Sequence, residues 1–225
     1  MNRWLLVSIL VLSCGMSVAD EAAYEAECNA IAPRQANEVK ASIAEIAVDE
    51  SRSTSDDLAF MSGLYNEIDR SIGGITSADP LVHYQIDPNL ALLPDRKGVC
   101  ARPAIRLTIG YSSMNVFMDR EISRGSCLYN AIFAHEMHHV AIYKDYISHH
   151  IGQIKKDIDD KFNGKTYFFE SLFKAKQYVE ILGQVFTQHV REKYLGEVNA
   201  EQTALDTQAE YSRMQLECLP AGHPM

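Results

Sequence analysis

The sequence predicts an α+β fold with an N-terminal αα-hairpin, a small antiparallel sheet, one long central helix and further helices towards the C-terminus. Three observations lead to this prediction. Apolar residues recur at helical spacing over residues 33–72, alternate with polar residues over 80–125, and return to helical spacing from residue 126 onwards. One region of strands is therefore flanked by helices along the chain, an order typical of an α+β domain.

The first 19 residues have the composition of a secretory signal peptide. Arg3 precedes a short apolar run, and Ser17-Val18-Ala19 supplies the small residues of a cleavage site. A second interpretation starts from Val11-Leu12-Ser13-Cys14, which resembles a lipobox and would make Cys14 a lipid anchor. We expect a secreted or periplasmic protein in which residues 20–225 form a single domain without a transmembrane segment.

The charge balance excludes one class of partner. The chain carries 30 acidic and 21 basic side chains, which give a formal net charge of −9. An acidic protein is repelled by the phosphates of nucleic acids and by anionic membrane surfaces. We therefore expect no nucleic-acid partner, although the charge alone does not define a substrate.

Residues 33–72 are predicted to form the helical hairpin. Pro33 suits a first helical turn, and an apolar stripe follows it at helical spacing. Thr54-Ser55-Asp56-Asp57 then has the pattern of a capping box ahead of a second stripe, which Gly73-Gly74 ends. We expect these two helices to pack over the rest of the domain.

Residues 80–125 are predicted to form the sheet, and the C-terminal half is predicted to be helical. Candidate strands cover residues 82–86, 105–111 and 116–122. Helical patterns cover residues 155–162, 172–190 and 197–216, and residues 167–169 either begin a helix or form a short strand.

The most informative motif is His135-Glu136-Met137-His138-His139. It lies within residues 126–151, which contain neither proline nor glycine and therefore favour one long helix. Four residues apart on a helix, His135 and His139 project from one face and can hold one metal ion. Glu136 lies a step around the helix, where its carboxylate can take a proton from a metal-bound water. The spacing therefore predicts a Zn²⁺ site with Glu136 as the general base.

Catalytic zinc takes a third protein ligand, and the sequence leaves its identity open. A carboxylate from the predicted helix over residues 197–216 is preferred, in the order Glu201, Asp206 and Glu197. Glu201 comes first because apolar residues three before it and four after it place it on the inward face of that helix.

Four cysteines remain after the leader, an even number that in an exported protein predicts two disulfides. Four cysteines allow three pairings. We favour Cys100–Cys127, which would brace the segment before the metal helix, and Cys28–Cys218, which would tie the two ends together. A four-cysteine zinc site is the competing interpretation, and the lack of closely spaced cysteine pairs disfavours it.

The motif, taken together with residues 199–206, resembles the signature of the gluzincin family of zinc metalloproteases. That signature is an HExxH helix and a later glutamate helix closed by an acid, here Glu201 and Asp206. The stretch 202–206 is also similar to bacterial families thought to be secreted zinc-dependent proteases, a likeness that favours Asp206 as the ligand. The resemblance implies a zincin-like fold, zinc as the cofactor and a protein or peptide substrate. It also implies an edge strand beside the metal helix, for which residues 116–122 are the candidate.

The sequence thus predicts an exported zinc metallopeptidase with His135, His139 and Glu201 as metal ligands. Candidates for the donor that stabilises the oxyanion are His189, Tyr194 and Tyr211. Two alternatives stay open: a non-catalytic, zinc-stabilised envelope or interaction protein, and a hydrolase of cell-wall amides.

Overall fold

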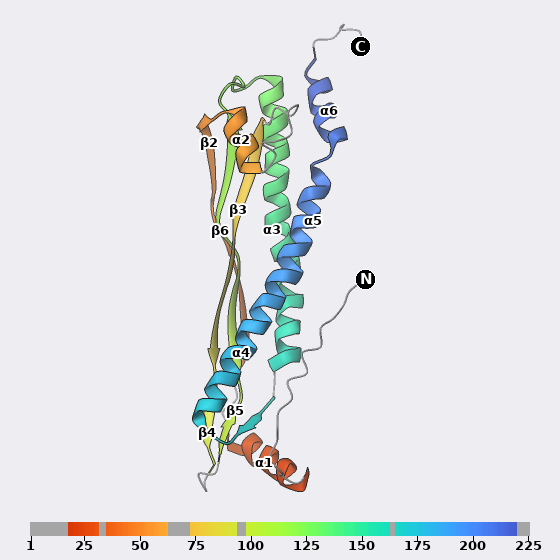
Figure 1. The fold of residues 1–225 in the computed structure, drawn as a ribbon. Helices are drawn as coiled ribbons and strands as arrows, with labels where there is room; N and C mark the ends of the chain where they lie inside the picture. Colours follow the sequence, from red (N-terminus) through yellow and green to blue (C-terminus); the bar gives the residue numbers. More distant parts are fainter. Residues whose placement is uncertain (1–17, 32–34, 63–72, 94–97, 163–164, 220–225) are drawn as a thin grey trace.

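The computed structural model describes residues 18–31, 35–62, 73–93, 98–162 and 165–219, and it confirms the α+β class (Figure 1). The helices are α1 (Val18–Ile31), α2 (Ser55–Ser62), α3 (Cys127–Phe162), α4 (Leu172–Val190), α5 (Gly196–Leu205) and α6 (Gln208–Glu217), with a π-helical turn, η1 (Arg191–Leu195), between α4 and α5. The strands are β1 (Glu38–Ile43), β2 (Ile46–Ser53), β3 (Gly74–Asp87), β4 (Leu90–Leu92), β5 (Val99–Ala101), β6 (Ala104–Asp119) and β7 (Tyr167–Phe169). The predicted signal peptide lies almost entirely in residues 1–17, outside the described residues, as does Cys14.

The main sheet is built around β6, a strand of 16 residues. On one side β3 pairs with it in the antiparallel sense. On the other side β1 and β2 both run parallel to it, β1 opposite residues 106–111 and β2 opposite residues 114–119. β1 and β2 therefore act as one interrupted strand. A second, smaller sheet has the order β4-β5-β7 and is antiparallel throughout.

Gly110 allows β1 to approach β6 closely. Its φ is 152°, a backbone conformation that residues with a side chain rarely adopt. A Cβ built on Gly110 would lie 1.8 Å from the carbonyl oxygen of Ser42, its partner on β1. Glycine is therefore required at this position for the pairing that the sheet shows.

The first half of the predicted helical hairpin is wrong, because residues 38–53 form β1 and β2. A spacing of four puts Val39 and Ile43 on one face of a helix, but it also equals two strand periods and puts them on one face of a strand. Both residues pack against the core from the strand. The second helix begins as predicted, since the Thr54 hydroxyl accepts from the Asp57 N–H at 3.2 Å and the Asp57 carboxylate accepts from the Thr54 N–H at 2.9 Å. Its continuation over residues 63–72 lies outside the described residues.

The prediction that residues 116–122 form a separate edge strand is also wrong. Residues 116–119 continue β6, which is paired on both sides there. Ser112, Ser113 and Asn115 interrupt the apolar alternation, but the Ser112 hydroxyl donates to the Asp79 carbonyl of β3 at 3.3 Å. The strand therefore runs on, and β3 rather than residues 116–122 forms one edge of the main sheet.

The disulfides join Cys28 to Cys100 and Cys127 to Cys218, so the predicted pairing is wrong. The length of β6 explains the difference. Sixteen residues of extended chain span about 50 Å, so β6 carries the chain from the end of the molecule that holds β5 to the end where α3 begins (Figure 1). One disulfide therefore fastens α1 to β5, and the other fastens the end of α6 to the start of α3.

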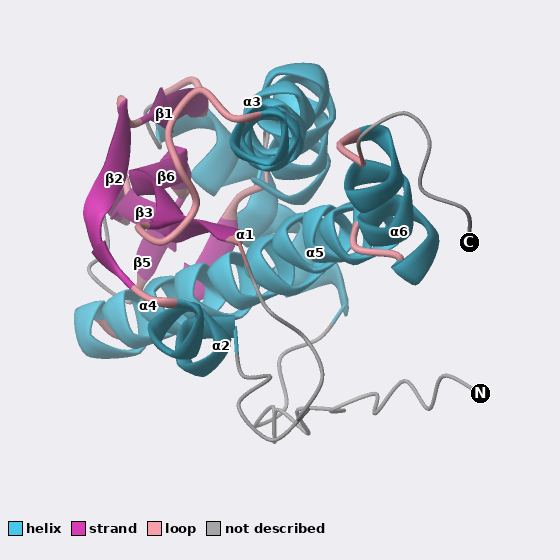
Figure 2. Ribbon diagram, turned by 90° about the horizontal axis from the view of Figure 1, so that it is seen from above, coloured by secondary structure: helices cyan, strands magenta, loops and turns pink. Residues whose placement is uncertain are grey.

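Helices cover one face of the main sheet, as Figure 2 shows. α3 contacts β1, β3 and β6, α4 lies on β3, and α5 packs on α3. The main core lies between these layers and includes Ile105, Leu107, Ile109, Ile147, Ile154, Ile158, Phe186 and Val190. No helix in the described part of the chain has both the length and the apolar composition needed to cross a membrane.

The last predicted helix, over residues 197–216, is two helices in the structure. α5 ends at Leu205, and Asp206 has φ −79° and ψ 63°, which is not helical. Thr207 then caps α6, because its hydroxyl accepts from the Glu210 N–H at 3.2 Å. This break lets the side chain of Asp206 leave the surface of the helix.

Candidate metal centre

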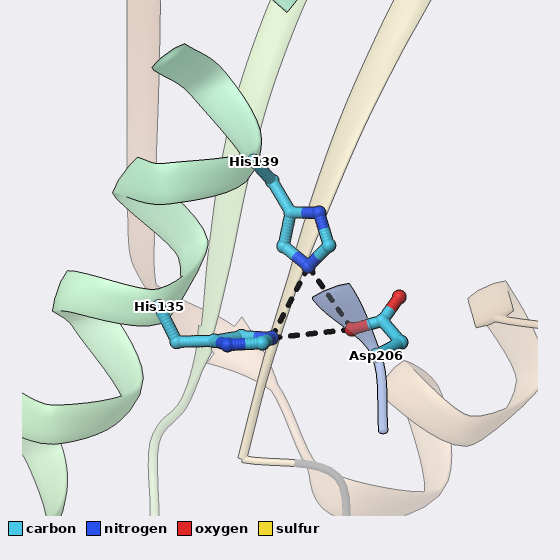
Figure 3. A group of neighbouring side chains, drawn as sticks. All are labelled: His135, His139 and Asp206. Carbon is cyan, nitrogen blue, oxygen red and sulfur yellow. Dashed lines mark hydrogen bonds and ion pairs between the residues drawn. The ribbon is translucent and has the colours of Figure 1, made fainter. Parts of the chain in front are cut away.

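Three side chains from two distant segments converge at α3 (Figure 3). His135 and His139 project from α3, and Asp206 comes from the junction of α5 and α6. The Nε2 atoms of the two histidines lie 3.1 Å apart. Oδ1 of Asp206 is 3.2 Å from Nε2 of His135 and 3.0 Å from Nε2 of His139. Among the residues that the structure describes, this is the one cluster of His, Cys, Asp and Glu side chains that could hold a metal ion.

The triangle of these three atoms has the dimensions of a metal-ligand set. Ligands about 2.0–2.1 Å from a tetrahedral zinc ion lie about 3.3 Å from one another, close to the 3.0–3.2 Å found here. Hydrogen bonds alone suit the triangle poorly, because two N–H groups donating to one oxygen would face each other at 3.1 Å. A cation among three lone pairs removes that conflict. Two imidazoles and a carboxylate form a donor set that zinc accepts, although other divalent transition metals accept it too.

The helix α3 presents the two histidines as the motif predicts. The Ser126 hydroxyl caps its first turn by accepting from the Tyr129 N–H at 3.1 Å. His135 is 5% exposed and His139 is 7% exposed. Buried imidazoles need partners for their nitrogens, and α5 and the segment that follows supply them to both nitrogens of His139 and to Nε2 of His135.

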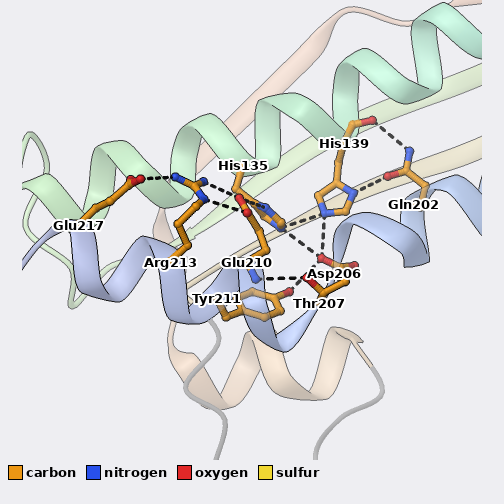
Figure 4. A network of polar contacts seen from close by, with 9 residues as sticks. All are labelled: His135, His139, Gln202, Asp206, Thr207, Glu210, Tyr211, Arg213 and Glu217. Carbon is orange, nitrogen blue, oxygen red and sulfur yellow. Dashed lines mark hydrogen bonds and ion pairs between the residues drawn. The ribbon is translucent and has the colours of Figure 1, made fainter. Parts of the chain in front are cut away.

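Gln202 fixes the orientation of His139 (Figure 4). Its Oε1 contacts Nδ1 of His139, and its Nε2 donates to the His139 carbonyl at 3.0 Å. The contact to Oε1 makes Nδ1 the protonated nitrogen, so that the lone pair of Nε2 points at Asp206. The sequence did not single out Gln202, which lies beside the favoured ligand Glu201.

Glu201 does not join the cluster, in contrast to the prediction. It is exposed and lines a separate pocket with His138 and Asp145, whereas its neighbour Gln202 is only 8% exposed. The π-helical turn η1 accounts for this difference. It has more residues per turn than an α-helix, so residues spaced four apart before and after it stay on the buried face. These are Val190, Tyr194, Val198 and Gln202. Glu197, the third-ranked ligand, is also elsewhere and contacts the Tyr146 hydroxyl.

Asp206, ranked second in the sequence, is the carboxylate that the structure brings to both histidines. An uninterrupted helix would place it about 140° around the axis from Glu201. The break after Leu205 removes this constraint. A sequence signal for the break exists, because Thr207-Gln208-Ala209-Glu210 has the pattern of a capping box, which marks a helix start.

Glu136 lies one residue along α3 from His135 and faces β3. The Thr76 hydroxyl donates to its carboxylate at 2.7 Å. Gly74 leaves room for the side chain, since a Cβ there would lie 2.9 Å from Cγ of Glu136. Burial raises the pKa of the Glu136 carboxyl, although Thr76 and the two histidines act in the opposite direction. A raised pKa makes a carboxylate a better proton acceptor, which suits a general base.

Tyr211 brings a hydroxyl to the cluster, and it donates to Oδ1 of Asp206 at 2.9 Å. Burial alone would raise the pKa of the Asp206 carboxyl, but the close contacts with His135, His139 and Tyr211 outweigh it, and the pKa is lowered. Of the other two oxyanion candidates, Tyr194 donates to Asp157 at 2.8 Å and His189 lies near the ring of Phe186. Tyr211 is therefore the candidate that lies at the site.

Comparisons with known proteins do not assign the chain to a family. No family model, no curated protein and no solved structure matches it. The function is therefore argued from the residues of the cluster and their surroundings.

Proposed function

We propose that this protein is a zinc-dependent metallopeptidase in which His135, His139 and Asp206 hold the ion. The observation that carries the proposal is the 3.0–3.2 Å triangle of ligand atoms with a buried glutamate, Glu136, on the same turn of α3. When bound at such a site, zinc lowers the pKa of a water molecule and polarises a carbonyl group.

Side chains around the cluster supply the other parts of a hydrolytic mechanism. Glu136 takes the proton from the water and passes it to the leaving amine, while Thr76 orients its carboxylate. Tyr211 donates its hydroxyl proton to Asp206, and we assign to it the stabilisation of the oxyanion once this hydroxyl turns from Asp206 to the substrate. Gln202 keeps His139 in the orientation that binding needs.

The edge of β3 is the proposed place for an extended substrate, instead of residues 116–122. Within the described residues, β3 pairs only with β6, so its other edge is available to a further strand. β3 begins at Gly74, next to Glu136, and Thr76 contacts that carboxylate. A peptide that adds to this edge by β-augmentation would pass the general base. The two disulfides support the secreted or periplasmic location that the leader predicts.

Peptide hydrolysis with and without a chelator tests the proposal. We expect the purified protein to cleave casein or a peptide library, to stop when the metal is removed, and to recover when zinc is returned. His139→Ala should abolish both zinc retention and cleavage. His149→Ala is the matched control, because His149 is an exposed histidine of the same helix outside the cluster.

Other outcomes would favour the alternative functions. Stoichiometric zinc without any chelator-sensitive cleavage would support a zinc-stabilised binding protein. Release of peptidoglycan fragments without cleavage of peptides would support a cell-wall amide hydrolase. A protein that neither retains zinc nor cleaves any of these substrates would contradict the proposal.

A further inference from the structure

We infer that Glu210 is a positioning residue of the metal site, which accepts a hydrogen bond from His135 and is itself held in place by Arg213. The inference rests on the proposed function in one respect, since it takes His135 to be a metal ligand. It goes further in assigning to α6 the control of one ligand's orientation.

The first observation is a buried nitrogen without a partner. Nε2 of His135 faces Asp206 and His139, whereas Nδ1 of His135 is buried and, among the described residues, makes no hydrogen bond. A histidine that ligates through Nε2 carries its proton on Nδ1, and this N–H normally donates to a carboxylate, a carbonyl or water. His139 has such a partner in Gln202. His135 requires one too, because an unsatisfied buried N–H is costly.

The second observation is the carboxylate that faces this nitrogen. Oε1 of Glu210 lies 3.8 Å from Nδ1 of His135, and the Glu210 side chain is 24% exposed (Figure 4). A charge-assisted hydrogen bond has a length of about 2.8 Å, so a shift of about 1 Å would form it.

The third observation is the clamp on Glu210. Arg213 binds its carboxylate through two nitrogens, Nε at 2.9 Å and Nη2 at 2.6 Å, and uses Nη1 to bind Glu217 at 2.6 Å. Exposed ion pairs of this kind contribute little to stability. A fork that binds both oxygens of one carboxylate does, however, restrict its orientation. We therefore assign the clamp to the orientation of Glu210 towards His135.

The helix that carries this network is fixed at both ends. It begins two residues after the ligand Asp206, and it is followed by Cys218, which is bonded to Cys127 at the start of α3. The two metal-binding histidines are thus oriented from different helices, His139 by an amide of α5 and His135 by a carboxylate of α6. A carboxylate partner makes an imidazole a more basic ligand, so the loss of Glu210 should weaken metal binding.

Zinc affinity, measured by competition with a chromophoric chelator, tests the inference. Glu210→Ala should weaken zinc binding about 10-fold to 100-fold. Glu210→Gln keeps an oxygen acceptor and should lose less, about 3-fold to 10-fold. Glu217→Gln is the matched control, because it removes the negative charge of the other partner of Arg213 without touching His135, and it should bind zinc as the wild type does. In the Co²⁺-loaded proteins, the visible spectrum should change in Glu210→Ala and return towards the wild-type spectrum in Glu210→Gln.

The outcomes separate this inference from the proposed function. Unchanged affinity and an unchanged cobalt spectrum in Glu210→Ala would overturn the inference, while zinc-dependent cleavage by the wild type would leave the function standing. Equal losses in Glu210→Ala and Glu217→Gln would also overturn it, because they would indicate a general role of α6. Should Glu210→Ala fail to fold, Glu210→Gln decides, and wild-type affinity in that variant rejects the inference. A wild-type protein that takes up no zinc would overturn both the inference and the proposed function.

Discussion

Replacing Asp206 with alanine is expected to abolish zinc retention, whereas replacing Glu201 with alanine should leave it unchanged. Asp206 contributes the only anionic atom of the triangle, and Oδ1 lies within 3.2 Å of both histidine nitrogens. Loss of an outer partner of a ligand weakens metal binding about 10-fold to 100-fold. Loss of a ligand itself should cost more, so we expect a decrease of at least about 1,000-fold.

Metal content after gel filtration, followed by chelator competition, measures this difference. Glu201→Ala is the matched control, since it removes a carboxylate of α5 that is exposed and lies outside the cluster. Thermal unfolding gives an independent readout. Saturation at 1,000 times the dissociation constant stabilises a protein by about 4 kcal/mol, and Asp206→Ala should lose this zinc-dependent gain. Equimolar zinc bound to Asp206→Ala, or a loss of zinc from Glu201→Ala, would contradict the assignment of Asp206 as the third ligand.

The second large effect is expected from Glu136→Gln, which should keep zinc and the fold but lose hydrolysis. An amide has nearly the volume of the carboxylate, and its oxygen can still accept the hydrogen bond from Thr76. It cannot take a proton from water. General acid–base groups contribute about 10²-fold to 10⁴-fold to the rate, so we expect kcat to fall within that range.

Turnover is compared between variants that carry equal amounts of zinc, which separates chemistry from metal loss. Glu201→Gln serves as the control for removal of a nearby negative charge, and it should cleave at the wild-type rate. Near-normal turnover by zinc-loaded Glu136→Gln would exclude Glu136 as the base. A loss of zinc in this variant would instead indicate that Glu136 supports the metal site.

Local patterns predicted the parts of this site that depend on one helix. The spacing of His135 and His139 fixes their common face whatever the rest of the chain does, and the motif therefore located both histidines and Glu136. The third ligand depends on where two helices end. Treating residues 197–216 as one helix favoured Glu201, whereas the capping box at Thr207 divides that segment and turns Asp206 towards α3.

Long-range pairing accounts for what the sequence did not predict. Val39 and Ile43 fit a helix and a strand equally well, and only the edge of β6 decides between them. The cysteine pairing depends on the length of β6, which separates Cys100 from Cys127 by the length of the main sheet. The sequence did not predict Glu210 for the same reason, because this residue approaches His135 only when α6 packs beside α3.

Zinc K-edge X-ray absorption of the wild-type protein, loaded with one equivalent of zinc, tests the central claim most directly. The account predicts two imidazole nitrogens and at least one carboxylate oxygen at about 2.0–2.1 Å, with no sulfur ligand. The spectrum of Asp206→Ala should lack this coordination. A sulfur shell at about 2.3 Å, or an ion without imidazole ligands, would contradict the assignment of the site to His135, His139 and Asp206.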